Sequence, residues 1–143
     1  MPRIELLMSL LAGLAGGFAG VLWGGFVTSA WIAHHRDRQP VALRGESPAR
    51  LVAGAALYGA AGAALGFLFW LGWGLVALVG FPWYATGVLF GLLCWVATAL
   101  PVLGTLAIRL RGFTPFATAH AVEWLVACLA VGLFCALSWY RYA

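Results

Sequence analysis

Two ionisable residues, His120 and Glu123, lie in the last apolar segment of the chain, where they could do chemistry. Their spacing of three puts both on one face of a helix. Glu123 is eight residues beyond Pro115, which is about 12 Å along a helix at a rise of 1.5 Å per residue. A carboxyl group at that depth in a membrane is costly unless it is paired, protonated or in contact with water.

This pair has two interpretations. In the structural one, Glu123 accepts a hydrogen bond from His120, or an ion pair from Arg109 or Arg111 reaching inward, and locks the register of the helices. In the functional one, Glu123 and His120 form a proton or small-cation site within the membrane, which exchanges its ion as the pocket alternates between sides.

Cofactor ligation by His120 is a third possibility. A bis-histidine haem site needs a second histidine at comparable depth, and His34 and His35 are at a helix end. Neighbouring side chains there point apart, and no further ligands complete a metal set. We therefore expect no haem or metal unless another subunit supplies the partner.

Motifs of soluble enzymes are absent from the sequence. There is no phosphate-binding glycine loop after a strand and no nucleophile with a histidine in a polar setting, so we predict that the protein is not an enzyme. The three cysteines fall inside apolar segments and are expected to be small core residues: Cys94, Cys128 and Cys135. The arginines are scattered and form no basic face for nucleic acid.

The segments that carry these residues belong in a bilayer. The chain has 143 residues, of which 64% are hydrophobic and 8% charged, too few polar side chains to cover a soluble globule. Because a membrane core takes about 20 apolar residues per helix, the sequence predicts four transmembrane helices. Their approximate ranges are 4–33, 48–79, 84–108 and 115–140.

The chain contains an internal repeat at an offset of 67 residues. Leu43–Pro48 returns as Leu110–Pro115, and Gly20–Gly24 returns as Gly87–Gly91. We therefore predict an all-α, four-helix membrane bundle built from two tandem hairpins, 1–80 and 81–143, in parallel orientation and related by a pseudo-two-fold axis.

Both repeats contain turn and cap signals. Ser47-Pro48 and Thr114-Pro115 are each a hydroxyl N-cap followed by a proline at the first helical position. Gly45 and Gly112 supply the backbone freedom for the tight return before each of these helices.

Small residues recur at spacings of three and four and predict close helix packing. Pro101 should bend the third helix, because it removes one helical hydrogen bond. The glycines expected at helix interfaces are Gly13, Gly16, Gly17, Gly20, Gly24, Gly59, Gly62, Gly66, Gly87 and Gly91.

The arginines predict the topology. Six of the eight lie in or just after the loops 34–47 and 109–114, Arg50 being the one that follows, whereas only Arg3 and Arg141 flank the opposite ends. By the positive-inside rule both loops are cytoplasmic and both termini are outside. Arginine in place of lysine, with abundant Ala and Gly, suits a bacterial inner-membrane protein.

Two functions remain open from the sequence. The first is a non-catalytic accessory or structural subunit, which packs against itself or other membrane subunits through its Gly/Ala-rich faces, with membrane lipids as its surroundings. The alternative is a homo-oligomeric transporter or channel for a small ion or cation that uses Glu123 and His120.

Overall fold

The computed structural model is entirely helical over the residues it describes, 2–35, 47–77 and 80–142. The first rod consists of α1 (Pro2–Trp23), a π-helical turn η1 (Gly24–Thr28) and α2 (Ser29–His34). The other helices are α3 (Pro48–Ala77), α4 (Trp83–Arg109) and α5 (Thr114–Tyr142). The predicted loop residues Arg36, Arg38, Arg44 and Gly45 lie outside the described residues.

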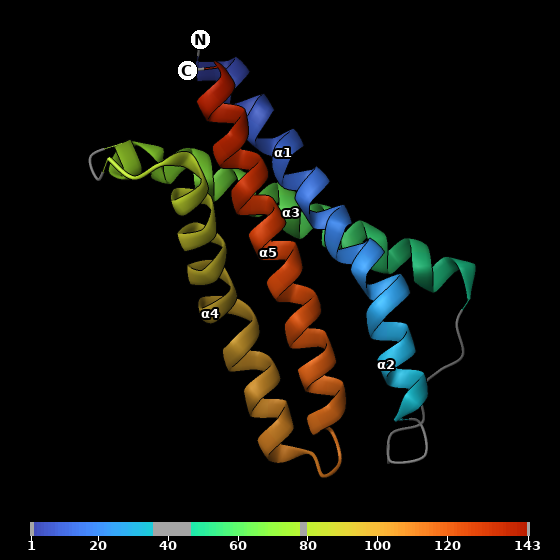
Figure 1. Ribbon diagram of the computed structural model, residues 1–143. Coiled ribbons are helices and arrows are strands. Elements are labelled where there is room, and N and C mark those ends of the chain that lie inside the picture. Colours follow the sequence, from blue (N-terminus) through green and yellow to red (C-terminus); the bar gives the residue numbers. More distant parts are fainter. Residues whose placement is uncertain (1, 36–46, 78–79, 143) are drawn as a thin grey trace.

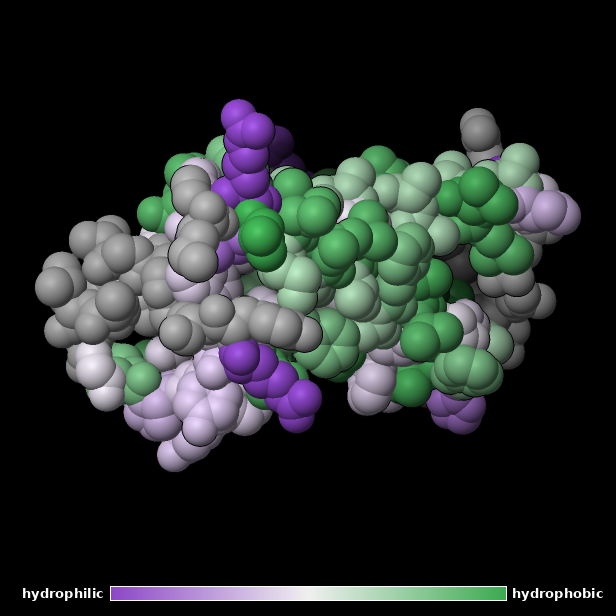
Figure 2. Space-filling model, turned by 90° about the horizontal axis from the view of Figure 1, so that it is seen from above, coloured by the Kyte–Doolittle hydropathy of each residue, from purple (hydrophilic) through white to green (hydrophobic). Residues whose placement is uncertain are grey.

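Four rods in the described part of the chain are long and apolar enough to cross a membrane: Arg3–His34, Pro48–Gly72, Trp83–Arg109 and Thr114–Arg141. Large apolar side chains are exposed along them, including Phe26 at 78% and Ile108 at 88%. Apolar residues cover most of the described surface seen in Figure 2, and hydrophilic residues form separate groups at its edges. Such an exterior is stable in lipid, so the chain is a multi-pass membrane protein.

Local signals set the helix ends. The backbone N–H of Arg50 contacts the Ser47 hydroxyl at 3.3 Å, so Ser47 caps α3 as predicted, whereas α5 begins at Thr114 itself. Gly112, with φ of 74°, turns the chain between α4 and α5, in a region of backbone conformation that glycine adopts without strain. α4 continues through Pro101 as one helix.

The helices form an open row in which α5 is central. α1 packs against α3, α5 packs along α1, and α4 packs along α5, whereas α3 makes little contact with α4. Figure 1 shows α3 crossing behind α1 and α5, while α4 and α5 run side by side. The two chain ends lie together at one end of α1 and α5, and the α4–α5 turn and the end of α2 lie at the opposite end.

This row differs from the predicted two-fold arrangement of hairpins. A two-fold axis would require α3 to contact α4 as α1 contacts α5, and among the described residues it does not. The reason is steric. α1 uses one glycine face for α3 and another for α5, whereas α4 uses its glycines only on α5.

The crossing of α1 and α3 is a backbone-to-backbone contact. A Cβ added at Gly13 would collide with the carbonyl oxygen of Gly62, and one at Gly62 would collide with that of Gly13. Gly17 faces the backbone of Tyr58, and Gly66 faces that of Ser9, in the same way. At this distance dispersion and Cα–H···O contacts hold helices together in lipid.

The contact of α1 with α5 is antiparallel and keeps one register along its length. The indole N–H of Trp139 donates to the Ser9 hydroxyl at 2.8 Å at one end, and the indole N–H of Trp31 donates to the Pro115 carbonyl at 3.2 Å at the other. Between these bonds, Gly16 faces Val131, Gly20 faces Ala127 and Gly24 faces Glu123.

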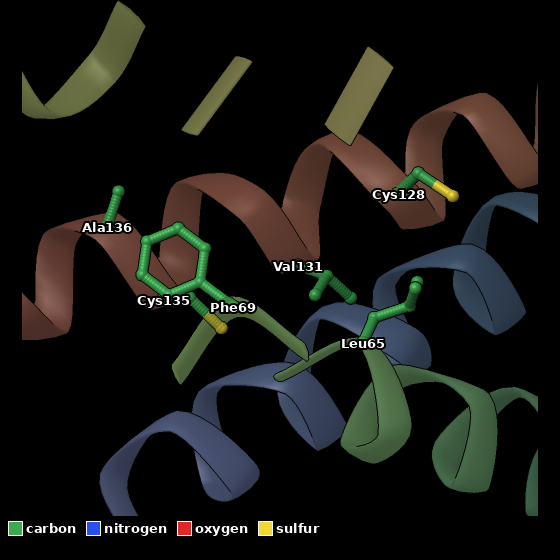
Figure 3. Close-up of a cluster of buried hydrophobic side chains, with 6 residues drawn as sticks. All are labelled: Leu65, Phe69, Cys128, Val131, Cys135 and Ala136. Atoms are coloured by element: carbon green, nitrogen blue, oxygen red, sulfur yellow. The ribbon is translucent and has the colours of Figure 1, made fainter. Parts of the chain in front are cut away.

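The buried core lies on the side of this contact nearer the chain ends. Figure 3 shows that α3 and α5 contribute all of its fully buried apolar side chains, beside the ribbon of α1. These residues are Leu65, Phe69, Cys128, Val131, Cys135 and Ala136. The core therefore fixes α3 and α5 relative to each other on one side of Glu123.

We expect Gly62→Ala to lower the free energy of unfolding by about 1–3 kcal/mol, since the added methyl group has no space beside the Gly13 carbonyl. Gly54→Ala is the matched control on the same helix, because nothing lies within 4 Å of its Cβ position. It should be neutral or slightly stabilising. Denaturant titration in mixed micelles measures both changes, and equal stabilities of the two variants would contradict the close crossing.

Candidate functional site

Glu123 is buried in the middle of α5, with 6% of its surface exposed. Its carboxylate lies directly against Gly24 of the π-helical turn η1. A Cβ at residue 24 would be 2.7 Å from Oε1 and 2.9 Å from Cδ of Glu123. The carboxylate therefore occupies the space that a side chain on α1 would otherwise fill.

His120 lies one helical turn from Glu123, toward the start of α5. Its Nδ1 is 3.4 Å from Oε2 of Glu123, and 28% of its side chain is exposed. The imidazole packs on the ring of Phe116, with centroids 4.3 Å apart. His120 therefore lies between the buried carboxylate and the protein surface.

Neither predicted arginine pairs with this carboxylate. Arg109 ends α4 and Arg111 lies in the turn before α5, and both are exposed. Among the residues that the structure describes, His120 is the only ion-pair partner of Glu123.

Tyr58 brings α3 into the site, which the sequence did not predict. Its hydroxyl interacts with the Glu123 carboxylate. Its ring stacks on Trp124 of α5, with centroids 4.7 Å apart and an interplanar angle of 21°. It also lies over Gly20, where an added Cβ would be 3.0 Å from two ring atoms. The hydroxyl is therefore held in place by contacts on two helices.

Thr28 is the second residue that sequence reasoning missed as part of the site. It is buried, with 4% of its surface exposed. Its hydroxyl interacts with the Glu123 carboxylate but is not in the geometry of a hydrogen bond with any described group. An unbonded buried hydroxyl is unusual in a folded protein.

Thr28 is the last residue of the π-helical turn. Both the N–H and the hydroxyl of Ser29 bond to the Gly24 carbonyl, the hydroxyl at 2.8 Å. A π turn adds one residue to a helical turn and often occurs at a functional site. The Gly24-Gly25 pair followed by Ser29 is the sequence signal that could have indicated it.

The arrangement is an oxygen-rich site shared by three rods. Glu123 comes from α5, Tyr58 from α3 and Thr28 from η1, and His120 lies at its edge. A carboxyl group with hydroxyl and imidazole neighbours can bind and release a proton, or bind a cation. Both predicted ion-site residues are therefore brought together at a junction of helices.

The other candidate ligands lie elsewhere. No group of three or more His, Cys, Asp or Glu residues that could hold a metal occurs in the described residues. His35 stacks on Trp31 at the end of the first rod, away from Glu123. The cysteines are free thiols: Cys94, Cys128 and Cys135.

The glycines predicted at helix interfaces all face another helix of the same chain. Besides those described above, Gly59 faces the ring of Phe18, and Gly87 and Gly91 face the backbone of α5. By contrast, nothing lies within 4 Å of a Cβ at Gly25, Gly54, Gly72 or Gly104.

No protein-family model matches this chain, and neither a curated protein nor a solved structure is significantly similar to it. Its function must be inferred from the geometry of the site.

We expect Tyr58→Phe to lower the free energy of unfolding by about 1–2 kcal/mol, in the range of the stronger hydrogen bonds between helices in membranes. The phenylalanine keeps the stack on Trp124 but has no hydroxyl group to interact with the Glu123 carboxylate. Tyr84→Phe is the control, because Tyr84 is exposed, and should change stability by less than about 0.5 kcal/mol. If both variants unfold alike in mixed micelles, the Tyr58 hydroxyl does not stabilise the carboxylate.

Proposed function

We propose that the protein is a membrane transporter or channel for a small ion, in which Glu123 exchanges a proton or cation within the bilayer. One observation supports this proposal above all: a buried carboxylate at membrane depth, contacted from three rods and linked to the surface by His120. Transmembrane helices bear ionisable residues of this kind mainly along ion and proton pathways.

The role of each residue follows from its contacts. Glu123 is the group that takes up and releases the ion. His120, which is part-exposed and 3.4 Å away, passes protons between the carboxylate and the nearer membrane surface. Tyr58 and Thr28 stabilise the ionised carboxylate when the ion leaves. The π-helical turn gives α1 a local segment whose hydrogen bonding can change as the site opens.

The open row of helices supports a homo-oligomer as the working unit. Among the described residues α4 packs mainly on α5 and makes little contact with α3, so the described helices do not surround a path. In the proposed assembly a second copy lies against this open side.

The competing proposal is a non-catalytic accessory subunit. It depends on glycine-rich faces that remain free for partners, and the glycines expected to serve that purpose are in contact within the chain. This observation favours the ion site, and the experiment below separates the two proposals.

The proposed topology has both termini outside a bacterial inner membrane and the loops 34–47 and 109–114 in the cytoplasm. The exposed Arg109 and Arg111 support it, because positive residues remain on the cytoplasmic side. The proposed origin is a tandem duplication of a two-helix unit at an offset of 67. Its support is the return of Leu43–Pro48 as Leu110–Pro115 and of Gly20–Gly24 as Gly87–Gly91.

We expect liposomes that contain only this protein to dissipate a pH gradient in exchange for a cation, and Glu123→Gln to slow that flux at least about tenfold. Glu5→Gln is the matched control, since Glu5 lies in the first turn of α1, and should retain full flux. A pH-sensitive dye inside the liposomes reports the rate.

Absence of flux from the wild-type protein would reject the transporter. If the protein in addition always leaves its native membrane with the same partner subunits, the accessory role is supported instead.

A further inference from the structure

We propose that the Glu123 site binds a small monovalent metal cation, with Na⁺ as the probe, and that the Thr28 hydroxyl is one of its ligands. The inference rests on the proposed function and names the ion that competes with the proton. The other oxygen ligands are the Glu123 carboxylate and the Tyr58 hydroxyl.

Thr28 carries this inference. Its hydroxyl is buried, faces the carboxylate and has no hydrogen-bond partner among the described residues. A threonine hydroxyl has two lone pairs that can accept a hydrogen bond or ligate a metal. A cation between this oxygen and the carboxylate would satisfy both groups at once.

The donor set selects the class of ion. Carboxylate and hydroxyl oxygens are hard ligands that suit alkali and alkaline-earth cations, whereas transition metals prefer imidazole and thiolate. Ca²⁺ and Mg²⁺ sites use several carboxylates or a shell of waters, and of the residues that the structure describes only Glu123 brings a carboxylate to this site. One negative charge balances one monovalent cation in a low-dielectric setting.

The small size of Gly24 helps to define the site. Because residue 24 has no Cβ, the carboxylate can lie against the first rod, where an added Cβ would be 2.7 Å from Oε1. The same turn presents Thr28 to that carboxylate. The first rod thus contributes both the close approach of the carboxylate and the proposed ligand Thr28.

Protons and the cation compete for the same carboxylate. The titratable groups that face it are His120 on α5 and Tyr58 on α3, and η1 contributes only the non-titrating Thr28. Cys128 lies beside Tyr58, and α4 supplies no partner of Glu123 among the described residues. A protonated Glu123 has no charge for the cation, so cation binding must weaken in acid.

The test measures binding to the purified full chain in detergent by isothermal titration calorimetry with NaCl, at constant ionic strength kept by choline chloride. We expect saturable Na⁺ binding to the wild-type protein. Thr28→Val should weaken the affinity at least about tenfold, because it removes one ligand and keeps the shape of the side chain. Glu123→Gln should abolish binding.

Two controls exclude loss of folding as the cause. Thr28→Ser keeps the hydroxyl and should bind Na⁺ within about threefold of wild type. Thr86→Val changes a buried threonine of α4 and should bind like wild type.

The inference is overturned if wild-type protein shows no difference between Na⁺ and choline, or if Thr28→Val binds as tightly as Thr86→Val. Its failure can be told from that of the proposed function. Without Na⁺ binding, a proton flux that needs Glu123 would leave the transporter in place with a different counter-ion.

Discussion

The structure depends on the close approach of α1 to α5, which places a carboxylate between two helices in an apolar medium. This approach is possible because the first rod has glycine at three positions that face α5, Gly16, Gly20 and Gly24. The first two glycines admit Val131 and Ala127, which seal the contact with apolar groups. Gly24 makes room for Glu123. Glycine at close helix contacts therefore produces both a tight interface and a polar site within it.

The same helix must satisfy two neighbours at once, and it does so with two glycine faces. Gly13 and Gly17 meet the backbone of α3, while the other face meets α5. This crossing holds α3 at an angle to α1 and α5 (Figure 1), at which Tyr58 reaches the carboxylate and α3 makes little contact with α4. A helix packed along α4 would have closed the row into a bundle and moved Tyr58 from the site. The crossing of α1 and α3 therefore explains both the asymmetry of the fold and the contact of Tyr58 with Glu123.

Much of this fold could be predicted from the sequence, because lipid imposes simple rules. Span length and the cap at Ser47 depend on local chemistry, and so does the positive φ of Gly112. The nearness of His120 to Glu123 follows from helical spacing. Tyr58 and Thr28 could not be found in this way, since their contact with Glu123 depends on how whole helices rotate and cross. For Thr28, the spacing of four residues puts it on the same face as Gly24, but periodicity alone does not show that this face meets Glu123.

The proposed duplication gives a physical reason for the position of the site in the second copy. At an offset of 67, His120 and Glu123 correspond to Ala53 and Ala56, which are exposed on α3. A carboxylate at residue 56 would face lipid and find no partner, at a high cost in free energy. The equivalent position on the central helix α5 faces a glycine of α1 and a tyrosine of α3. Only the second copy, whose helix α5 has neighbours on several sides, could therefore acquire a buried acidic residue. The site thus depends on the unequal packing of the helices in the row.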